Sequence, residues 1–251
     1  MGDCVFDLTS EQFGEEKLVY ADAPVETRDA HFAKAEKKQR YEYLRMLLDA
    51  FCAFGIRRLP KKDWESYAIP FSYTSESYFD LVIEEEADEM RVLLKKKPFD
   101  APVTHSSEEY DFPDRLYQDF WEGADAWGIA DKDGALLACI ETCPEEWSNR
   151  LMVTELWVHE SLRRKGVGKR LMDIAKGEAE LMDRRAIILE MQTCNANAFA
   201  FYRAQGFVLA GFDSCCYTNA DAERREVRLD LAWFPEKWKG RAKRFDSESN
   251  S

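Results

Sequence analysis

The sequence predicts a protein of the α/β class, built on one mixed β-sheet with helices on its faces. Three observations lead to this prediction. Apolar residues make up 45% of the 251 positions, which is enough for a sizeable core. Several short apolar, strand-like runs fill the middle of the chain. The following part alternates strand, helix, strand, helix and strand, an order that brings helices onto the faces of a sheet.

The first expected element is a helix over residues 27–54, and Gly55 is its stop signal. Its apolar face would contain four residues at helical spacing: Tyr41, Leu44, Leu48 and Phe51. Residues 57–77 contain two prolines and many polar side chains, which favours a loop. Residues 1–70 are therefore expected to form a helical extension that covers the sheet, closes over a binding site or forms a dimer face.

Eight strands are expected from β-branched or alternating apolar residues: 78–86, 89–97, 126–130, 135–143, 151–158, 186–192, 207–217 and 226–234. The DKDG sequence at 131–134 predicts a hairpin turn. Further helices are expected over three segments: 111–121, 167–182 and 196–205. The end of the chain is polar and is expected to fray. The predicted organisation is the extension over 1–70, a main domain over 71–234 and a polar tail over 235–251.

The composition excludes several classes of protein. Lys and Arg total 35 against 48 Asp and Glu, and the net charge of −13 argues against a nucleic-acid partner. This charge suits a cationic small substrate, or solubility alone. The seven cysteines are scattered, and Cys139 and Cys143 lack the second Cys/His pair typical of a zinc site, so neither disulfides nor a metal are expected. No apolar run is long enough to span a membrane, and the first residues do not resemble a signal peptide. No membrane partner is therefore expected, and the expected location is the cytoplasm.

One segment of this acidic chain is basic and glycine-containing: LWVHESLRRKGVGKRLM, residues 156–172. A helix start leaves about four N–H groups without intrahelical acceptors, and these carry partial positive charge. Gly166 and Gly168 would let a phosphate approach such groups closely. Arg170 and Leu171 exclude a P-loop and a dinucleotide fingerprint, which need Ser or Thr and a third glycine there. The alternative is a tight turn with a solvated basic face.

Two motifs indicate a family. RRKGVG, residues 163–168, resembles the Arg/Gln-x-x-Gly-x-Gly/Ala signature of the GNAT family of N-acetyltransferases. NANAFAFYRAQGF, residues 195–207, is similar to that family's next motif, with five matching residues: Asn195, Ala198, Tyr202, Gly206 and Phe207. Residues 188–219 resemble the streptothricin acetyltransferase branch. The resemblance covers roughly residues 70–234, and the preceding residues have no counterpart.

The resemblance implies a GNAT-like acyl-CoA N-acyltransferase fold, whose mixed sheet opens after the fourth strand, with an N-terminal helical extension added. It implies transfer of an acetyl group from acetyl-CoA, with the pantetheine arm along residues 156–158 and the pyrophosphate over the N–H groups of 164–169. The implied acetyl-CoA contacts are Leu156, Trp157, Val158, Arg163, Arg164, Lys165, Gly166, Val167, Gly168, Lys169, Asn195 and Tyr202.

The resemblance also implies roles at the reacting atoms. Tyr202 would protonate the leaving sulfur, or it is a core aromatic residue. Glu155 would accept the amine proton, directly or through water, or it is a solvent-facing acid. Asp213 and Tyr217 would line the acceptor pocket, although Asp213 also suits an ordinary strand end. Asn195 would bind the pantetheine arm, cap the following helix, or do both.

The expected function is therefore N-acetylation of a small cationic amine, with a streptothricin-like acceptor as one candidate. Two alternatives stay open: acetylation of a protein or peptide amine, and a non-catalytic acyl-CoA-binding module. A homodimer is also left open. Acceptor residues vary within one fold, so the acceptor itself does not follow from the resemblance.

Overall fold

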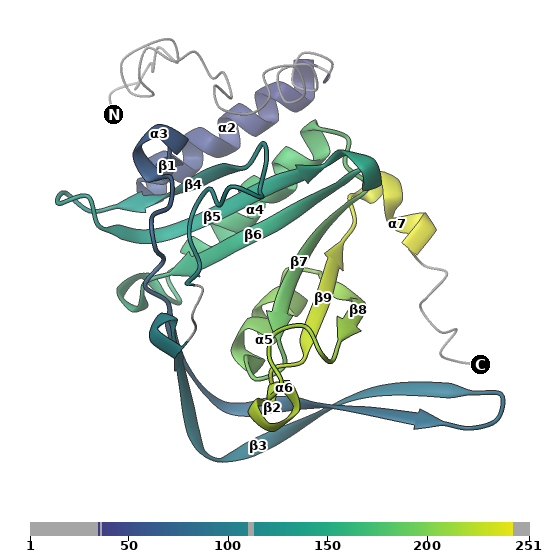
Figure 1. Ribbon diagram of the computed structural model, residues 1–251. Coiled ribbons are helices and arrows are strands. Elements are labelled where there is room, and N and C mark those ends of the chain that lie inside the picture. The colour runs from purple at the N-terminus through teal and green to yellow at the C-terminus, as the bar shows by residue number, and fades with distance from the viewer. Residues whose placement is uncertain (1–34, 36, 110–112, 243–251) are drawn as a thin grey trace.

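The computed structural model describes residue 35 and residues 37–109 and 113–242, and it contains two sheets (Figure 1). The strands of the larger sheet are β1 (Arg57–Arg58), β4 (Asp125–Ala130), β5 (Leu136–Glu145), β6 (Arg150–Val158), β7 (Ala186–Gln192), β8 (Val208–Asp213) and β9 (Arg228–Trp233). Their order across the sheet is β1–β4–β5–β6–β7–β9–β8. Two longer strands, β2 (Ser72–Glu85) and β3 (Met90–Ser106), form a separate antiparallel hairpin. The predicted mixed sheet is confirmed.

The larger sheet opens between β6 and β7. These strands run parallel and pair only over 150–153 and 186–189, whereas the other neighbours in this sheet are antiparallel. β6 continues to Val158 beside β5, and β7 continues to Gln192 beside β9, so the two halves of the sheet diverge (Figure 1). The end of each strand therefore borders an opening in the middle of the sheet.

Three helices share one core cluster with the sheet: α2 (Lys37–Phe54), α4 (Val167–Leu181) and α5 (Ala196–Ala204). Successive residues of β5 contribute to different core clusters. Ala138 and Ile140 join the cluster of these helices, while Cys139 between them joins a second cluster that contains Trp157. Since strand side chains alternate between the faces, the second cluster lies on the face opposite α4. The segments 59–71 and 116–124 cover that face.

Helix α2 packs closely on α4, where α4 has a glycine. A Cβ on Gly177 would lie 2.6 Å from Met46 Cε and 2.9 Å from Tyr43 Cδ2. The apolar face predicted for this helix is wrong. The buried residues are Tyr43, Leu47 and Ala50, while Tyr41 is 66% exposed. The predicted and the buried residues both have helical spacing. The buried ones belong to the face of α2 that packs against Gly177 of α4.

The described part of the N-terminal segment packs with the rest of the chain. β1 pairs with β4 at the edge of the larger sheet, and α2 contributes to the main core cluster. Residues 37–70 therefore form one packed unit with the domain expected over 71–234. Part of the helix predicted over 27–54 lies outside the described residues, as do residues 243–251 of the tail. None of the described helices combines the length and apolar character that crossing a membrane requires.

Other segments differ from the predictions. The hairpin strands are longer than the predicted 78–86 and 89–97, because pairing begins at Ser72 within the stretch predicted to be a loop. The helix predicted over 111–121 is wrong for the described residues 113–121, whose backbone bonds instead to the segment 66–69. The short helices are α3 (Lys61–Trp64), α6 (Asp221–Arg224), α7 (Glu236–Ala242) and the 3-10 turns Ser107–Glu109, Glu146–Ser148 and Glu160–Leu162.

Candidate functional site

Three elements meet where α4 begins. Gly168 lies in the first turn of α4, and a Cβ there would be 3.5 Å from Phe201 Cζ of α5 and 3.7 Å from Val158 Cγ2 of β6. The two motifs that were separate in the sequence, at 163–168 and 195–207, are therefore adjacent in space. They adjoin the end of β6, beside the opening in the sheet.

The turn before α4 exposes the N-terminal end of the helix. Gly166 is the N-cap residue and has a positive φ of 88°, a conformation that glycine adopts without strain. Helix geometry leaves the first N–H groups of α4 without intrahelical acceptors, so this end attracts anions. Lys165 is exposed, and so is Lys169, whose Nζ lies 3.2 Å from Asp173 Oδ2. Arg164 is exposed as well and has a positive φ of 62°. This arrangement has the features of a phosphate site.

Arg163 differs from its neighbours in what its side chain binds. Its Nε donates to the carbonyl oxygen of Val158 at 3.0 Å, and its Nη2 donates to that of Ser72 at 2.6 Å. The guanidinium thus ties the turn to the end of β6 and to the start of the hairpin. It contributes positive charge while holding the turn in place.

β6 carries a bulge at the opening. Glu141 of β5 is paired with Glu155 and Thr142 with Val153, which leaves Thr154 as the extra residue. Beyond the bulge, Leu156 and Val158 lie against the core cluster of α4, while Trp157 is buried in the cluster on the opposite face. By the same alternation Glu155 shares the face of Trp157. The bulge therefore sets which face receives the candidate base.

Glu155 lies among other acids. Burial raises the pKa of Glu155 well above its ordinary value, and the nearby charges of Asp114 and Glu141 raise it further. Glu141 is fully buried and accepts a hydrogen bond from Thr154 Oγ1 at 2.7 Å and another from Tyr117 N at 2.6 Å. A carboxylate with a raised pKa is a stronger base than a solvated one.

Tyr202 comes from α5 and is buried. Its ring packs against Phe201 and Phe207, with centroids 5.3 and 5.8 Å away. Burial raises the pKa of Tyr202, and the charge of Glu155 adds to the increase. The phenol therefore stays protonated at neutral pH, and it is near enough to Glu155 to respond to its charge. Both roles weighed for Tyr202, proton donor and core aromatic residue, agree with this position.

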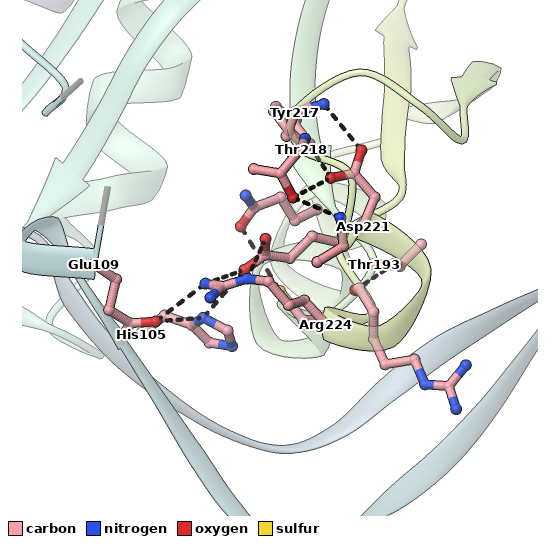
Figure 2. Close-up of polar contacts among 12 residues, drawn as sticks. His105, Glu109, Thr193, Tyr217, Thr218, Asp221 and Arg224 are labelled. Carbon is pink, nitrogen blue, oxygen red and sulfur yellow. Dashed lines mark hydrogen bonds and ion pairs between the residues drawn. The ribbon is translucent and has the colours of Figure 1, made fainter. Parts of the chain in front are cut away.

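The residues predicted to contact the acceptor lie at the end of β8 and just beyond it. Asp213 Oδ1 accepts a hydrogen bond from Cys215 N at 3.0 Å, and this bond lowers the pKa of Asp213. Tyr217 N donates to Asp221 Oδ2 at 2.9 Å (Figure 2). Burial raises the pKa of Tyr217, as does the charge of Glu190. Asp213 thus holds a turn, and its role toward an acceptor stays a prediction.

Asn195 caps α5. Its Oδ1 accepts a hydrogen bond from Ala198 N at 3.0 Å, which satisfies one N–H group of the first turn. The capping role predicted for this residue is confirmed, and its contact with a pantetheine arm stays a prediction.

The sequence analysis missed three acids around the opening. Glu141 and Glu190 lie in strands, and Asp114 lies in the segment wrongly predicted to be a helix. Burial raises the pKa of Asp114 and of Glu190. Glu141 carried a recognisable signal, since it is an acid within the otherwise apolar run ALLACIETC. Glu190 shares its face of β7 with Ile188, and Asp114 carried no signal because its position depends on an irregular segment.

Comparison with known proteins agrees with this architecture. Residues 87–207 match the model of the Acetyltransferase (GNAT) family. A streptothricin acetyltransferase from Streptomyces lavendulae is 26% identical over 159 residues, which cover 61% of this chain and 79% of that protein. This relative matches the branch that the sequence resembles.

Two solved structures share the fold. A nourseothricin acetyltransferase has a TM-score of 0.54 at 24% identity, covering 71% of this chain and 96% of its own. A structure described as a putative streptothricin acetyltransferase from Bacillus anthracis, in complex with acetyl coenzyme A, has a TM-score of 0.56 at 22% identity and covers 72% and 98% of the two chains.

Proposed function

Because the chain belongs to the GNAT family of acetyltransferases, we propose that it transfers an acetyl group from acetyl-CoA to the primary amine of a small cationic acceptor. The observation that carries the proposal is the convergence at Gly168. There the exposed start of α4, the end of β6 and the helix of Tyr202 meet beside the opening in the sheet. One elongated ligand could contact all three elements.

Different elements of the chain bind different parts of acetyl-CoA. The first N–H groups of α4, with Arg164, Lys165 and Lys169 around them, receive the pyrophosphate. The free edge of β6 beyond Val153 offers backbone groups to the pantetheine arm, as a neighbouring strand would. This arrangement leaves the thioester near Glu155 and Tyr202.

The transfer then needs two proton movements. Glu155 accepts a proton from the acceptor amine, directly or through water, and the amine nitrogen attacks the thioester carbon. N–H groups of β6 near Val158 stabilise the oxyanion that forms. As the C–S bond breaks, Tyr202 donates its proton to the sulfur, which leaves as the free thiol of coenzyme A. The nitrogen–carbon bond of the amide is the new bond, and no covalent enzyme intermediate is required.

The acids on the acceptor side support a cationic acceptor. Glu155 and Glu141 lie on the face of β5 and β6 opposite α4, with Asp114 close by. Glu190 and Asp213 lie in the strands beyond the opening. A substrate with several amines would bring positive charge to these groups and leave one neutral amine for attack. Streptothricin, the antibiotic in the name of the Streptomyces lavendulae relative, is the first acceptor to test.

The test is a thiol-release assay with acetyl-CoA and a panel of amines: streptothricin, small polyamines and peptides with free amino groups. Mass spectrometry identifies the acetylated product. The expected result is turnover with streptothricin or another polyamine and a mass gain of one acetyl group. Preferential acetylation of peptides would replace the proposed acceptor class. Acetyl-CoA binding by calorimetry, with no thiol release for any amine, would instead indicate a binding module.

A further inference from the structure

Three buried side chains that zinc commonly binds meet near α6. His105 comes from β3, Cys194 follows β7, and Glu226 lies between α6 and β9. Their ligand atoms all lie within 4.8 Å of one another. These residues are 3% (His105), 0% (Cys194) and 0% (Glu226) exposed. Figure 2 shows His105 pointing toward the polar groups around Arg224 and Glu109. Segments far apart in the sequence thus place a nitrogen, a sulfur and an oxygen around one point.

His105 is the unexplained member of this cluster. Among the described residues, neither Nδ1 nor Nε2 has a hydrogen-bond partner. The nearest carboxylate oxygens to Nδ1 belong to Glu226, at 3.5 Å, and to Glu109, at 3.7 Å. These distances are too long for good hydrogen bonds. The ring also stacks on Tyr73, with centroids 5.1 Å apart, so its orientation is held by packing. A buried imidazole without hydrogen bonds costs free energy unless something binds it.

We infer that His105, Cys194 and Glu226 bind a divalent transition-metal ion, for which zinc is the best fit. Imidazole nitrogen, thiolate sulfur and carboxylate oxygen are its usual protein ligands. At bond lengths of about 2.0–2.3 Å, tetrahedral ligand atoms lie about 3.3–3.8 Å apart. The separation of 3.5 Å between His105 Nδ1 and Glu226 Oε1 falls in this range. Glu109 or a water molecule would supply the fourth ligand.

The surrounding charges suit a divalent ion. Arg224 Nε and Nη2 donate to the two oxygens of Glu226 at 2.8 and 2.9 Å, and Nη2 also contacts Glu109 at 3.2 Å. Two carboxylates and one guanidinium leave a formal charge of −1. Without an ion, the fully buried sulfur of Cys194 is counted as a neutral thiol. Metal binding would break the S–H bond, release the proton to solvent and form a sulfur–metal bond, which brings the cluster to neutrality.

The ion would join three parts of the chain. β3 belongs to the hairpin, Cys194 immediately precedes the Asn195 cap of α5, and Glu226 immediately follows a residue bonded to Thr193. Thr193 Oγ1 donates to the carbonyl oxygen of Arg225 at 2.6 Å. Coordination would therefore fix the hairpin and the loop after β8 relative to the start of α5, and its main effect would be on stability.

The experiment uses the full chain after removal of metal with a chelator. Titration with Co²⁺, a spectroscopic substitute for Zn²⁺, should give a near-ultraviolet thiolate-to-metal absorption that saturates at one equivalent and disappears when Zn²⁺ is added. Cys194→Ser should abolish this band and weaken binding by at least about tenfold. Cys52→Ser removes an exposed cysteine of α2 and should leave the band unchanged. Zn²⁺ should raise the melting temperature of the chelator-treated protein but not that of the Cys194→Ser variant.

His105→Gln provides a second variant, and circular dichroism confirms that each variant is folded before titration. Saturable binding that depends on both His105 and Cys194 supports the site. Absence of the thiolate band, or equal Co²⁺ binding by Cys194→Ser and the unmodified chain, overturns the inference. An NMR spectrum of the His105 imidazole that Zn²⁺ leaves unchanged would also overturn it.

Discussion

Glu141 on β5 lies directly opposite Glu155 on β6, at the last pair before the bulge. Glu141 is fully buried and accepts hydrogen bonds from Thr154 Oγ1 and Tyr117 N, at 2.7 and 2.6 Å. Burial is the largest cause of the raised pKa of Glu155, followed by Asp114 and Glu141. Two adjacent carboxyl groups therefore have different environments, a pattern typical of acid–base sites.

Glu155→Gln should lower kcat and raise stability. Loss of a general base costs about 10²- to 10⁴-fold in rate. The folded-state pKa of Glu155 is raised, so the contribution of this group to stability is full below its unfolded pKa of about 4.3 and is lost as the pH rises through the folded-state value. Glutamine has no ionisable carboxyl group, so the variant does not lose stability as the pH rises. Urea unfolding should show the variant to be more stable at pH 8, with the difference closing near pH 4.

Two outcomes would contradict this view of Glu155. Unchanged kcat would remove its role as base. A variant less stable than the unmodified chain at pH 8 would show that the charged carboxylate is held by favourable contacts.

Glu141→Gln should shift the acidic limb of the pH–rate profile to lower pH. Removing its negative charge eases ionisation of Glu155, so the base stays active at lower pH. The profile of kcat/KM against pH measures the shift. Glu160→Gln, on the exposed 3-10 turn after β6, is the matched control and should leave the limb in place. An acidic limb that moves equally in both variants would show that Glu141 has no specific effect on the ionisation of Glu155.

Tyr202→Phe should reduce turnover by about 10²- to 10⁴-fold, because the leaving sulfur loses its proton donor. The affinity for acetyl-CoA, measured by calorimetry, should change little, since the ring and its packing on Phe207 remain. Tyr41→Phe, at an exposed position of α2, is the matched control. Normal turnover by Tyr202→Phe would leave this residue with a core role only.

Gly168→Glu should weaken acetyl-CoA binding more than Gly168→Gln does. Both side chains start from the same Cβ position, in ordinary contact with Phe201 at 3.5 Å, so their steric effects are similar. Only glutamate places negative charge where the pyrophosphate is expected. Calorimetry at low and high salt should show a difference that shrinks as salt screens the charge. Equal affinities of the two variants would place the phosphates elsewhere.

Gly128→Ala should destabilise the fold by about 1–3 kcal/mol, the usual cost of overpacking. A Cβ there would lie 2.2 Å from the carbonyl oxygen of Ala138 and 2.7 Å from Leu59 Cδ1. The backbones of β4 and β5 would have to separate. Gly168→Ala makes only ordinary contacts and is the control. The free energy of unfolding, measured with urea, should be lower for Gly128→Ala than for Gly168→Ala by more than the measurement error.

The sequence was sufficient to predict most strands and helices of the second half, because their periods are regular, but it missed α6 and α7 and extended the strand β8 past its end at Asp213. It failed for the buried face of α2 and for the fold of residues 113–121. In α2, two stripes of apolar residues compete, and only the glycine of α4 decides which one is buried. Backbone groups of residues 113–121 form hydrogen bonds with the segment 66–69. This pairing joins distant parts of the chain, so local propensity cannot reveal it.

What the sequence alone determined was the two motifs and the basic turn at 163–168, since each depends on residue types at short spacing. The candidate pair Glu155 and Tyr202 followed from the resemblance to the family and stays a prediction. Tertiary structure alone decided that the two motifs meet at Gly168 and that Glu141 lies opposite Glu155. It likewise decided the cluster of His105, Cys194 and Glu226. The physical reason is that strand register, the bulge at Thr154 and crossovers between distant segments set these contacts, and all three result from packing of the whole chain.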